Sequence, residues 1–222
     1  HRYQNQLFAG TSQGLFRLQA DGVKAAHFSA IDNFSNQTWD FADFADSMLI
    51  ANNKGVYQYR DGKSELIFDA PIPAKVLLVS RQQPDTVWVG LQNGLLRLQY
   101  RDGQWRNLGV ISGVVGNLNS LIEETDGSLW IGTRYGGLNR FNPATEQFSR
   151  VPLPAAQGEQ QQVEISVVYQ DPKGELWVGT YGGGLLRWNA KEARLENVTL
   201  PLPSNELDSL YINTLFRDAS GY

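Results

Sequence analysis

The chain contains no cysteine among its 222 residues. Disulfide bonds, thiolate zinc sites and thiol nucleophiles are therefore excluded, and the sequence is indifferent to the redox state of its compartment. Histidine is almost as scarce, because only His1 and His27 are present. Two histidines leave little possibility for a Ser-His-Asp triad and none for a metal site with more than two histidine ligands. We therefore expect a protein that is not an enzyme, with no catalytic residue, no metal and no cofactor.

Basic clusters and long apolar runs are also missing. The balance of 19 Lys and Arg against 23 Asp and Glu gives a net charge of −4, and no dense basic run is present to attract nucleic acid or anionic lipid. No segment approaches the ~18 apolar residues of a membrane span. The first residues lead almost directly into a strand, without a signal-like preamble. We expect a mature or excised region that binds no nucleic acid and does not itself insert into a membrane.

What the chain does contain is an internal repeat, present five times. Its motif is a strand, a glycine-bearing turn and a second strand, and it occurs at residues 6–18, 48–59, 87–98, 129–141 and 176–188. The equivalent central positions of the five copies are Gly10, Ala51, Gly90, Gly132 and Gly179. Their spacing of roughly forty residues is typical of a propeller blade and fits shorter helical repeats less well.

Further strands flank each motif. Three of the second strands run into Asp-Gly, the dipeptide suited to tight hairpin turns, so a third strand is predicted after each. Upstream of four motifs, β-rich segments supply one more strand at residues 39–44, 75–80, 119–124 and 165–170. Four short antiparallel strands per repeat and little helix signal predict an all-β fold, a β-propeller of four-stranded blades.

The two ends of the chain leave the blade count open. The chain is expected to begin at the second strand of its first repeat, and residues 211–222 match residues 164–175, the start of a repeat. Residues 211–222 are thus either the start of a sixth repeat or a strand that closes a five-bladed ring. Residues 1–222 are accordingly a single propeller domain or a propeller fragment. An unclosed fragment would present free strand edges and is expected to form homodimers or aggregates.

The fourth and fifth motifs, LWIGTRYGGLNRF and LWVGTYGGGLLRW, carry a resemblance to a known family. Together with the preceding Asp126-Gly127 turn they resemble the two-component regulator propeller repeat, and they lack the Trp-Asp ending of the WD repeat. The first three copies are more degenerate. The family's propellers usually have seven blades, so the resemblance favours a fragment of a seven-bladed propeller over a closed ring of five.

The resemblance also implies a function. In that family the propeller lies outside the cytoplasmic membrane, binds a nutrient such as a polysaccharide fragment, and signals to a histidine kinase or a diguanylate cyclase. By this resemblance the chain is a non-catalytic, periplasmic ligand-sensing domain of an inner-membrane receptor, with a small molecule or oligosaccharide as its ligand. The alternative is a structural or protein-interaction propeller that mediates dimerisation or partner docking.

Residues that recur at equivalent positions of several repeats are interpreted as structural. They are the glycines Gly10, Gly90, Gly132 and Gly179 and the tryptophans Trp88, Trp130 and Trp177. A large flat indole can fill the gap between adjacent blades. The recurring Arg140 and its equivalents are interpreted as inter-blade hydrogen-bond donors.

Residues that break the repeat are the better candidates for binding a ligand. In a propeller, the motif turns and the loops leading into each inner strand share one face. The aromatic, amide and guanidinium side chains expected there are Trp39, Asn117, Arg134, Tyr135, Tyr181 and Asn205. Aromatic faces with amide donors suit a sugar, although each of these residues is also an ordinary loop residue.

Overall fold

We describe the protein from a computed structural model. The described residues are 1–19, 26–32, 34–114, 116–154, 163–199 and 211–216. Within them the chain forms the strands β1 to β20 and no helix, so the described part contains nothing helical that could cross a bilayer. The prediction of an all-β fold is confirmed.

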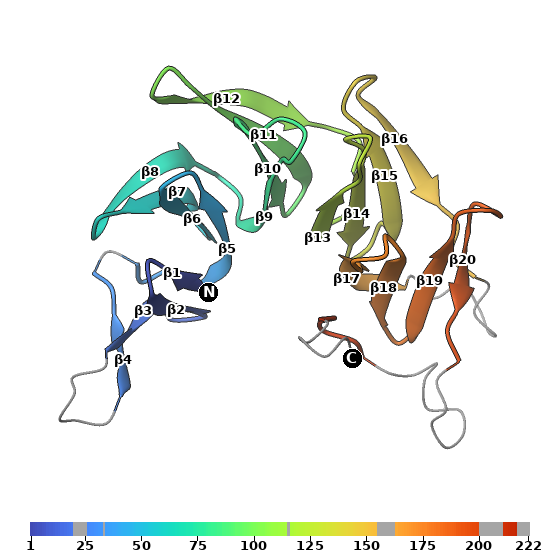
Figure 1. The fold of residues 1–222 in the computed structure, drawn as a ribbon, viewed down its shortest axis with the longest axis horizontal. Helices are drawn as coiled ribbons and strands as arrows, with labels where there is room; N and C mark the ends of the chain where they lie inside the picture. The colour runs from blue at the N-terminus through green and yellow to red at the C-terminus, as the bar shows by residue number, and fades with distance from the viewer. Residues whose placement is uncertain (20–25, 33, 115, 155–162, 200–210, 217–222) are drawn as a thin grey trace. The chain divides into compact units, whose positions relative to one another are not determined.

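The strands form five four-stranded antiparallel sheets, which follow one another along the chain (Figure 1). The first is β1 (Arg2–Tyr3), β2 (Gln6–Thr11), β3 (Gly14–Gln19) and β4 (His27–Ala30). The second is β5 (Thr38–Phe44), β6 (Ser47–Asn52), β7 (Gly55–Arg60) and β8 (Lys63–Asp69). The third is β9 (Ala74–Val79), β10 (Thr86–Leu91), β11 (Gly94–Arg101) and β12 (Gln104–Ile111).

The last two sheets have the same order. The fourth is β13 (Leu118–Glu123), β14 (Leu129–Thr133), β15 (Leu138–Asn142) and β16 (Gln147–Val151). The fifth is β17 (Glu164–Gln170), β18 (Leu176–Tyr181), β19 (Leu185–Asn189) and β20 (Arg194–Asn197). Each sheet is a propeller blade, and each predicted motif supplies its second and third strands. We call the first strand of each blade the inner strand.

The expectation that the chain begins at a second strand is wrong. The short strand β1 precedes it, with Tyr3 opposite Gln6 and Arg2 opposite Leu7. A two-residue strand carries too little alternation of apolar and polar residues to be recognised in a sequence. The choice between a five-bladed ring and a fragment of a larger propeller stays a prediction.

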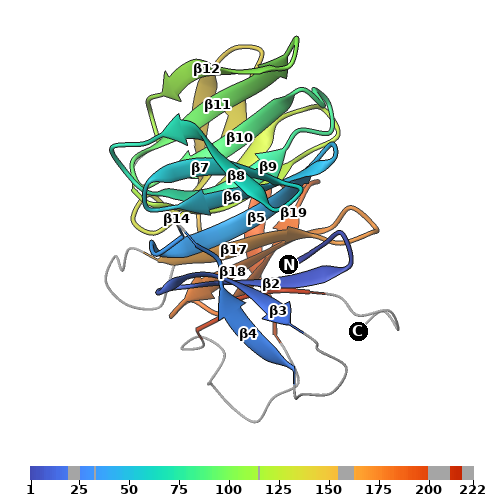
Figure 2. The ribbon, with the colours of Figure 1, turned by 90° about the vertical axis from the view of Figure 1, so that its left-hand side faces the viewer.

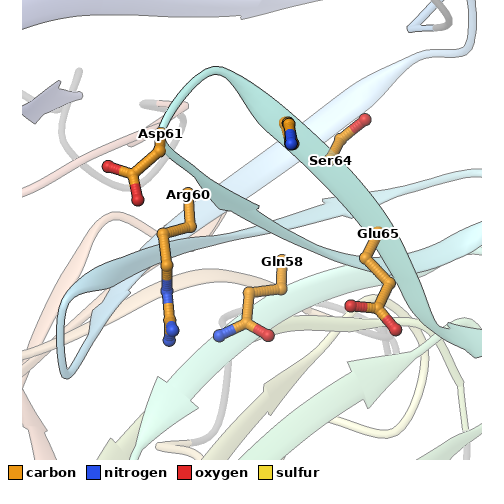
Figure 3. Close-up of a pocket in the computed structure, with 6 residues that line it drawn as sticks. Gln58, Arg60, Asp61, Ser64 and Glu65 are labelled. Atoms are coloured by element: carbon orange, nitrogen blue, oxygen red, sulfur yellow. The ribbon is translucent and has the colours of Figure 1, made fainter.

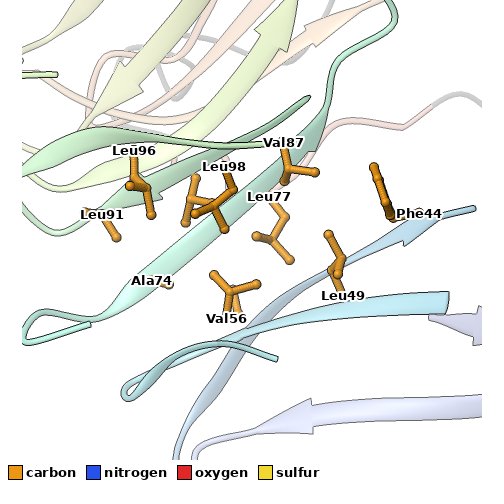
Figure 4. Packing of buried hydrophobic residues seen from close by; sticks show 11 residues of the cluster. Phe44, Leu49, Val56, Ala74, Leu77, Val87, Leu91, Leu96 and Leu98 are labelled. Carbon is orange, nitrogen blue, oxygen red and sulfur yellow. The ribbon is translucent and has the colours of Figure 1, made fainter. Parts of the chain in front are cut away.

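The chain divides into two compact units, which we describe separately. Unit 1 comprises His1–Gln92 and Leu96–Gly109, and unit 2 comprises Asn93–Leu95 and Val110–Tyr222. In unit 1 the second and third blades lie face to face (Figure 2). Their core joins Leu49 and Val56 to Leu77 and Val87 (Figure 4). The second strands β6 and β10 are buried at every position, which explains why they read as continuous apolar runs.

The core of unit 2 lies between the fourth and fifth blades. Trp130 on β14 is 1% exposed and packs edge to face against Trp188 on β19, with ring centroids 5.0 Å apart. Trp177, the equivalent of Trp130 in the fifth blade, is partly buried. Arg140 contacts Glu124 and Asp126 at 2.5 and 3.0 Å, and because both lie in its own blade, these ion pairs are not the predicted inter-blade contacts.

The motif glycines allow one blade to approach the next. A Cβ added at Gly132 would lie 2.6 Å from Ile165 on the following inner strand, and one at Gly10 would lie 2.8 Å from Thr38. Both distances are far below van der Waals contact, so any side chain would push the neighbouring strand away. The glycines recur because the inner strand of the next blade packs directly on this position.

Every inner strand from the second blade to the fifth has a bulge at the same place. The pairing register shifts by one residue just before the strand reaches the motif glycine or its equivalent Ala51. The extra residues are Trp39, Lys75, Asn119 and Ser166. A bulge turns one side chain out of the ladder, and bulges are frequent beside functional sites.

Candidate ligand-binding face

The loop-face residues of unit 1 gather around Trp39. This indole is 40% exposed, and its Nε1 donates a hydrogen bond of 2.8 Å to Oδ1 of Asn53 in the motif turn between β6 and β7. The Lys75 ammonium of the next inner strand lies 4.4 Å from the ring centroid, a cation–π distance. The ring is thus held at its edge by an amide and covered by a cation, while a large part of it remains accessible.

A second group of loop-face residues forms in unit 2, around Glu164 at the start of β17. One carboxylate oxygen lies 3.3 Å from Nε of Arg134, and the other accepts a hydrogen bond of 3.2 Å from Nδ2 of Asn119. Asn119 also donates to the Ile165 carbonyl at 2.9 Å. The bulge residue of the fourth blade therefore fixes the carboxylate of the fifth, and the carboxylate in turn orients the guanidinium.

Arg134 connects this carboxylate to an exposed tyrosine. The guanidinium carbon lies 5.3 Å from the ring centroid of Tyr135, and the Tyr135 side chain is 51% exposed. The Arg134 amide donates to the Asn117 carbonyl at 2.8 Å, so Asn117 anchors the turn through its backbone. Arg134 itself is half-exposed. A planar cation and an aromatic face are presented together on one turn.

Tyr181 extends the group on its other side. Tyr181 pairs with Glu164 in the sheet and forms an isolated antiparallel bridge with Tyr211, whose ring centroid is 5.6 Å away. The Ile212 amide donates to the Thr180 carbonyl at 3.0 Å, and the Ser166 hydroxyl donates to the Ile212 carbonyl. Residues 211–216 therefore dock on the fifth blade as an inner strand docks on the blade before it.

Four of the predicted residues, Asn117, Arg134, Tyr135 and Tyr181, thus belong to one group in unit 2. Arg134 contacts the Glu164 carboxylate and Tyr181 pairs with Glu164 in the sheet, whereas Asn117 and Tyr135 contact Arg134. Trp39 lies in unit 1, and Asn205 lies outside the described residues. The prediction missed Lys75, Asn119 and Glu164. The first two are bulge residues, which depend on pairing register and leave no signal in one sequence. Glu164 lies just before the predicted strand 165–170, and the structure extends that strand to include it, opposite Tyr181.

Two hollows of unit 1 were not predicted. One, of about 560 Å³, is lined by residues of the hairpin β7–β8, including Arg60, Asp61 and Glu65 (Figure 3). A second, of about 490 Å³, shares Lys63 with it and reaches the first blade. Both lie at the Asp61-Gly62 end of β7, whereas Asn53 precedes the opposite end. Their charges are mixed, and Arg60 is paired with Asp46 at 2.6 Å.

The exposed side chains of each of the two groups are able to stack on a ligand and to form hydrogen bonds with it. Indole and phenol rings offer stacking surfaces, and the amide, carboxylate and guanidinium offer donors and acceptors for hydroxyl groups. Within the described residues no three His, Asp or Glu side chains are grouped to hold a metal ion.

Sequence comparison supports the resemblance to a known family over one repeat. The model of the two component regulator propeller matches residues 159–182, which include Glu164 and Tyr181. No curated protein matches the chain.

Three solved structures with similar folds come from Bacteroides thetaiotaomicron. The chain is similar to the extracellular domain of the hybrid two component system BT4673, with a TM-score of 0.73, 21% identity and 97% of this chain covered. A second structure of that extracellular domain, described as a one component system, has a TM-score of 0.67 at 21% identity, covering 86% of this chain and 26% of the other. A protein of unknown function has a TM-score of 0.52 at 13% identity, covering 72% of this chain and 42% of the other. The chain spans 28% of the first structure's length, so these likenesses establish the propeller fold alone.

Proposed function

We propose, from the two component regulator propeller match, that this chain is a ligand-recognition part of the extracytoplasmic region of a bacterial signal-transduction receptor. The chain itself is non-catalytic, and a kinase or cyclase output would belong to other parts of the receptor. The similar extracellular domains support this placement as an analogy of fold.

The observation that carries the proposal is the group around Glu164. Arg134, Tyr135, Asn119 and Tyr181 come from two blades and do not repeat in the others, so they break the symmetry of the scaffold. A repeated scaffold needs such asymmetry to bind one ligand in one orientation. Because the group combines aromatic faces with several hydrogen-bonding side chains, we propose a polyhydroxylated ligand of the carbohydrate type.

The proposal is tested by thermal melting of the chain with oligosaccharides, peptides and small organic acids. A ligand that binds only the folded state at 100 times its Kd adds about 2.7 kcal/mol of stability and raises Tm. We expect one sugar class to raise Tm, and Tyr135→Ala to abolish the rise. Phe28→Ala is the matched control, because Phe28 is an aromatic residue of similar exposure at 47% in the first blade.

The alternative function, a protein-interaction propeller, predicts another result from the same samples. No small molecule would raise Tm, and the melting temperature and sedimentation would change with protein concentration. That combination of results would contradict the ligand-sensing proposal.

A further inference from the structure

One acidic side chain links the inner strands of two blades in unit 1. Asp40 follows the bulge residue Trp39 on β5 and pairs with Ala51. Its Oδ2 accepts a hydrogen bond of 2.8 Å from the amide of Leu77, which lies on β9 of the next blade, and its Oδ1 accepts one of 2.8 Å from the amide of Phe41. The carboxylate therefore connects the second blade to the third.

Unit 2 makes the same link with a serine. Ser120 follows the bulge residue of its own blade and pairs with Gly132, as Asp40 pairs with Ala51. Its hydroxyl accepts a hydrogen bond of 2.9 Å from the Val168 amide and lies 3.3 Å from the Val168 carbonyl, to which it donates.

The acceptor strands are in matching register as well. Leu77 and Val168 each pair with the residue immediately before the motif glycine of their blade, Val89 and Val178. Asp40 and Ser120 thus make the same connection, a hydrogen bond to the inner strand of the next blade. A serine hydroxyl both donates and accepts hydrogen bonds, whereas an ionised carboxylate only accepts them. A protonated carboxyl group can donate a hydrogen bond as well.

The surroundings of Asp40 disfavour its charge. Burial raises the pKa of this carboxyl to about 6, and the amides of Leu77 and Phe41 lower it by a smaller amount. The adjacent strands β2 and β6 carry no charged residue. On β9 the charged residue is Lys75, whose ammonium lies over Trp39, and on β5 it is Asp43, which contacts His1 at 2.9 Å.

We propose that Asp40 is a proton-operated link between the second and third blades, whose protonation completes the two-way hydrogen bond that Ser120 makes permanently in unit 2. The proton binds to the carboxylate, and the new hydroxyl donates to the Leu77 carbonyl. Because Asp40 directly follows Trp39 and Leu77 lies two residues after Lys75, the link also stiffens the Trp39–Lys75 pair in mild acid. Proton binding at Asp40 requires no ligand and is independent of the proposed function.

The sign of the pH dependence follows from linkage. A carboxyl whose pKa is raised in the folded state binds more protons when folded than when unfolded between about pH 4 and pH 6. Stability is therefore expected to increase as the pH falls through about 6. A carboxylate that is paired with a cation in the folded state has the opposite effect, because its stabilisation is lost as the pH falls.

The test compares denaturant midpoints of the whole chain at about pH 7 and about pH 5 with direct titration of the Asp40 carboxyl carbon by NMR. We expect wild type to gain stability in acid, and Asp40→Asn, an amide that donates and accepts at any pH, to be more stable at neutral pH and to lose the gain. Asp40→Ser should behave in the same way, and Asp43→Asn, at an exposed carboxylate, should keep the wild-type response.

The reciprocal change gives an independent readout. Ser120→Asp should introduce an acid-dependent stability into unit 2, together with faster amide exchange at Val168 in neutral solution than in mild acid. A wild-type Asp40 carboxyl that titrates near pH 4, or an acid response that persists in Asp40→Asn, overturns the proposal. The NMR titration decides the question even if a variant fails to fold.

Discussion

Gly132 and Gly179 show how a single missing side chain lets a neighbouring segment approach a blade closely. A Cβ at Gly179 would lie 2.7 Å from Ile212 and from Val167, much as a Cβ at Gly132 would lie 2.6 Å from Ile165. The motif glycine therefore contributes to stability by allowing the neighbouring segment to pack against it.

Substitution of this residue gives the first prediction. Gly132→Ala should destabilise the chain by about 1–3 kcal/mol, because the β-branched Ile165 and Val168 must move to admit the methyl group. Chemical denaturation measures the loss. Gly183→Ala is the comparison, since its nearest contacts are 3.0 Å and a smaller loss is expected. Equal losses would show that backbone entropy, and not the blade contact, determines the effect.

At the scale of elements, the motif turn depends on its threonine. Thr133 Oγ1 donates to the Gly137 carbonyl at 2.9 Å and accepts from the Gly136 amide at 2.9 Å. Thr180 makes the equivalent pair of bonds with Gly184 and Gly183. A buried side chain thus gives the Gly136 or Gly183 amide an acceptor, and it adds a second hydrogen bond to a carbonyl that already accepts the threonine amide.

Removal of the hydroxyl gives the second prediction. Thr133→Val keeps the shape but leaves the Gly136 amide without this partner, so a loss of about 1–3 kcal/mol is expected from denaturation. Thr133→Ser, which retains the hydroxyl, should lose much less. If valine and serine variants were equally stable, the turn would not depend on these bonds.

The sequence predicted the elements better than their pairing. The motif strands were predicted because apolar runs and glycine turns are local signals, as in residues 129–141. The bulges were not predicted, because they depend on how two strands align. Lys75 consequently looked like an ordinary strand residue until the register placed it over Trp39. Trp39, Arg134 and Tyr135 were accessible to prediction because each breaks the repeat.

At the scale of the whole molecule, charged side chains contribute opposite responses to acid. Asp126, at the turn between β13 and β14, accepts a 2.8 Å hydrogen bond from the Ser128 amide and lies 3.0 Å from Nη2 of Arg140. The hydrogen bond from the Ser128 amide is the main cause that lowers the pKa of Asp126 below its usual value, and the charge of Arg140 lowers it further. Its contribution to stability is present above about pH 4 and is lost in stronger acid.

Together these groups predict a stability curve with a maximum in mild acid. Stability should increase as the pH falls through about 6, where Asp40 takes up its proton, and then decrease as Asp126 is neutralised below about pH 4. Midpoints of urea denaturation across this range measure the curve. Asp126→Asn should flatten only the acid limb and cost under about 1 kcal/mol at neutral pH, because its side chain is 58% exposed. Asp40→Asn should flatten only the limb near pH 6, so a variant that changes both limbs would contradict this separation of the two carboxyls.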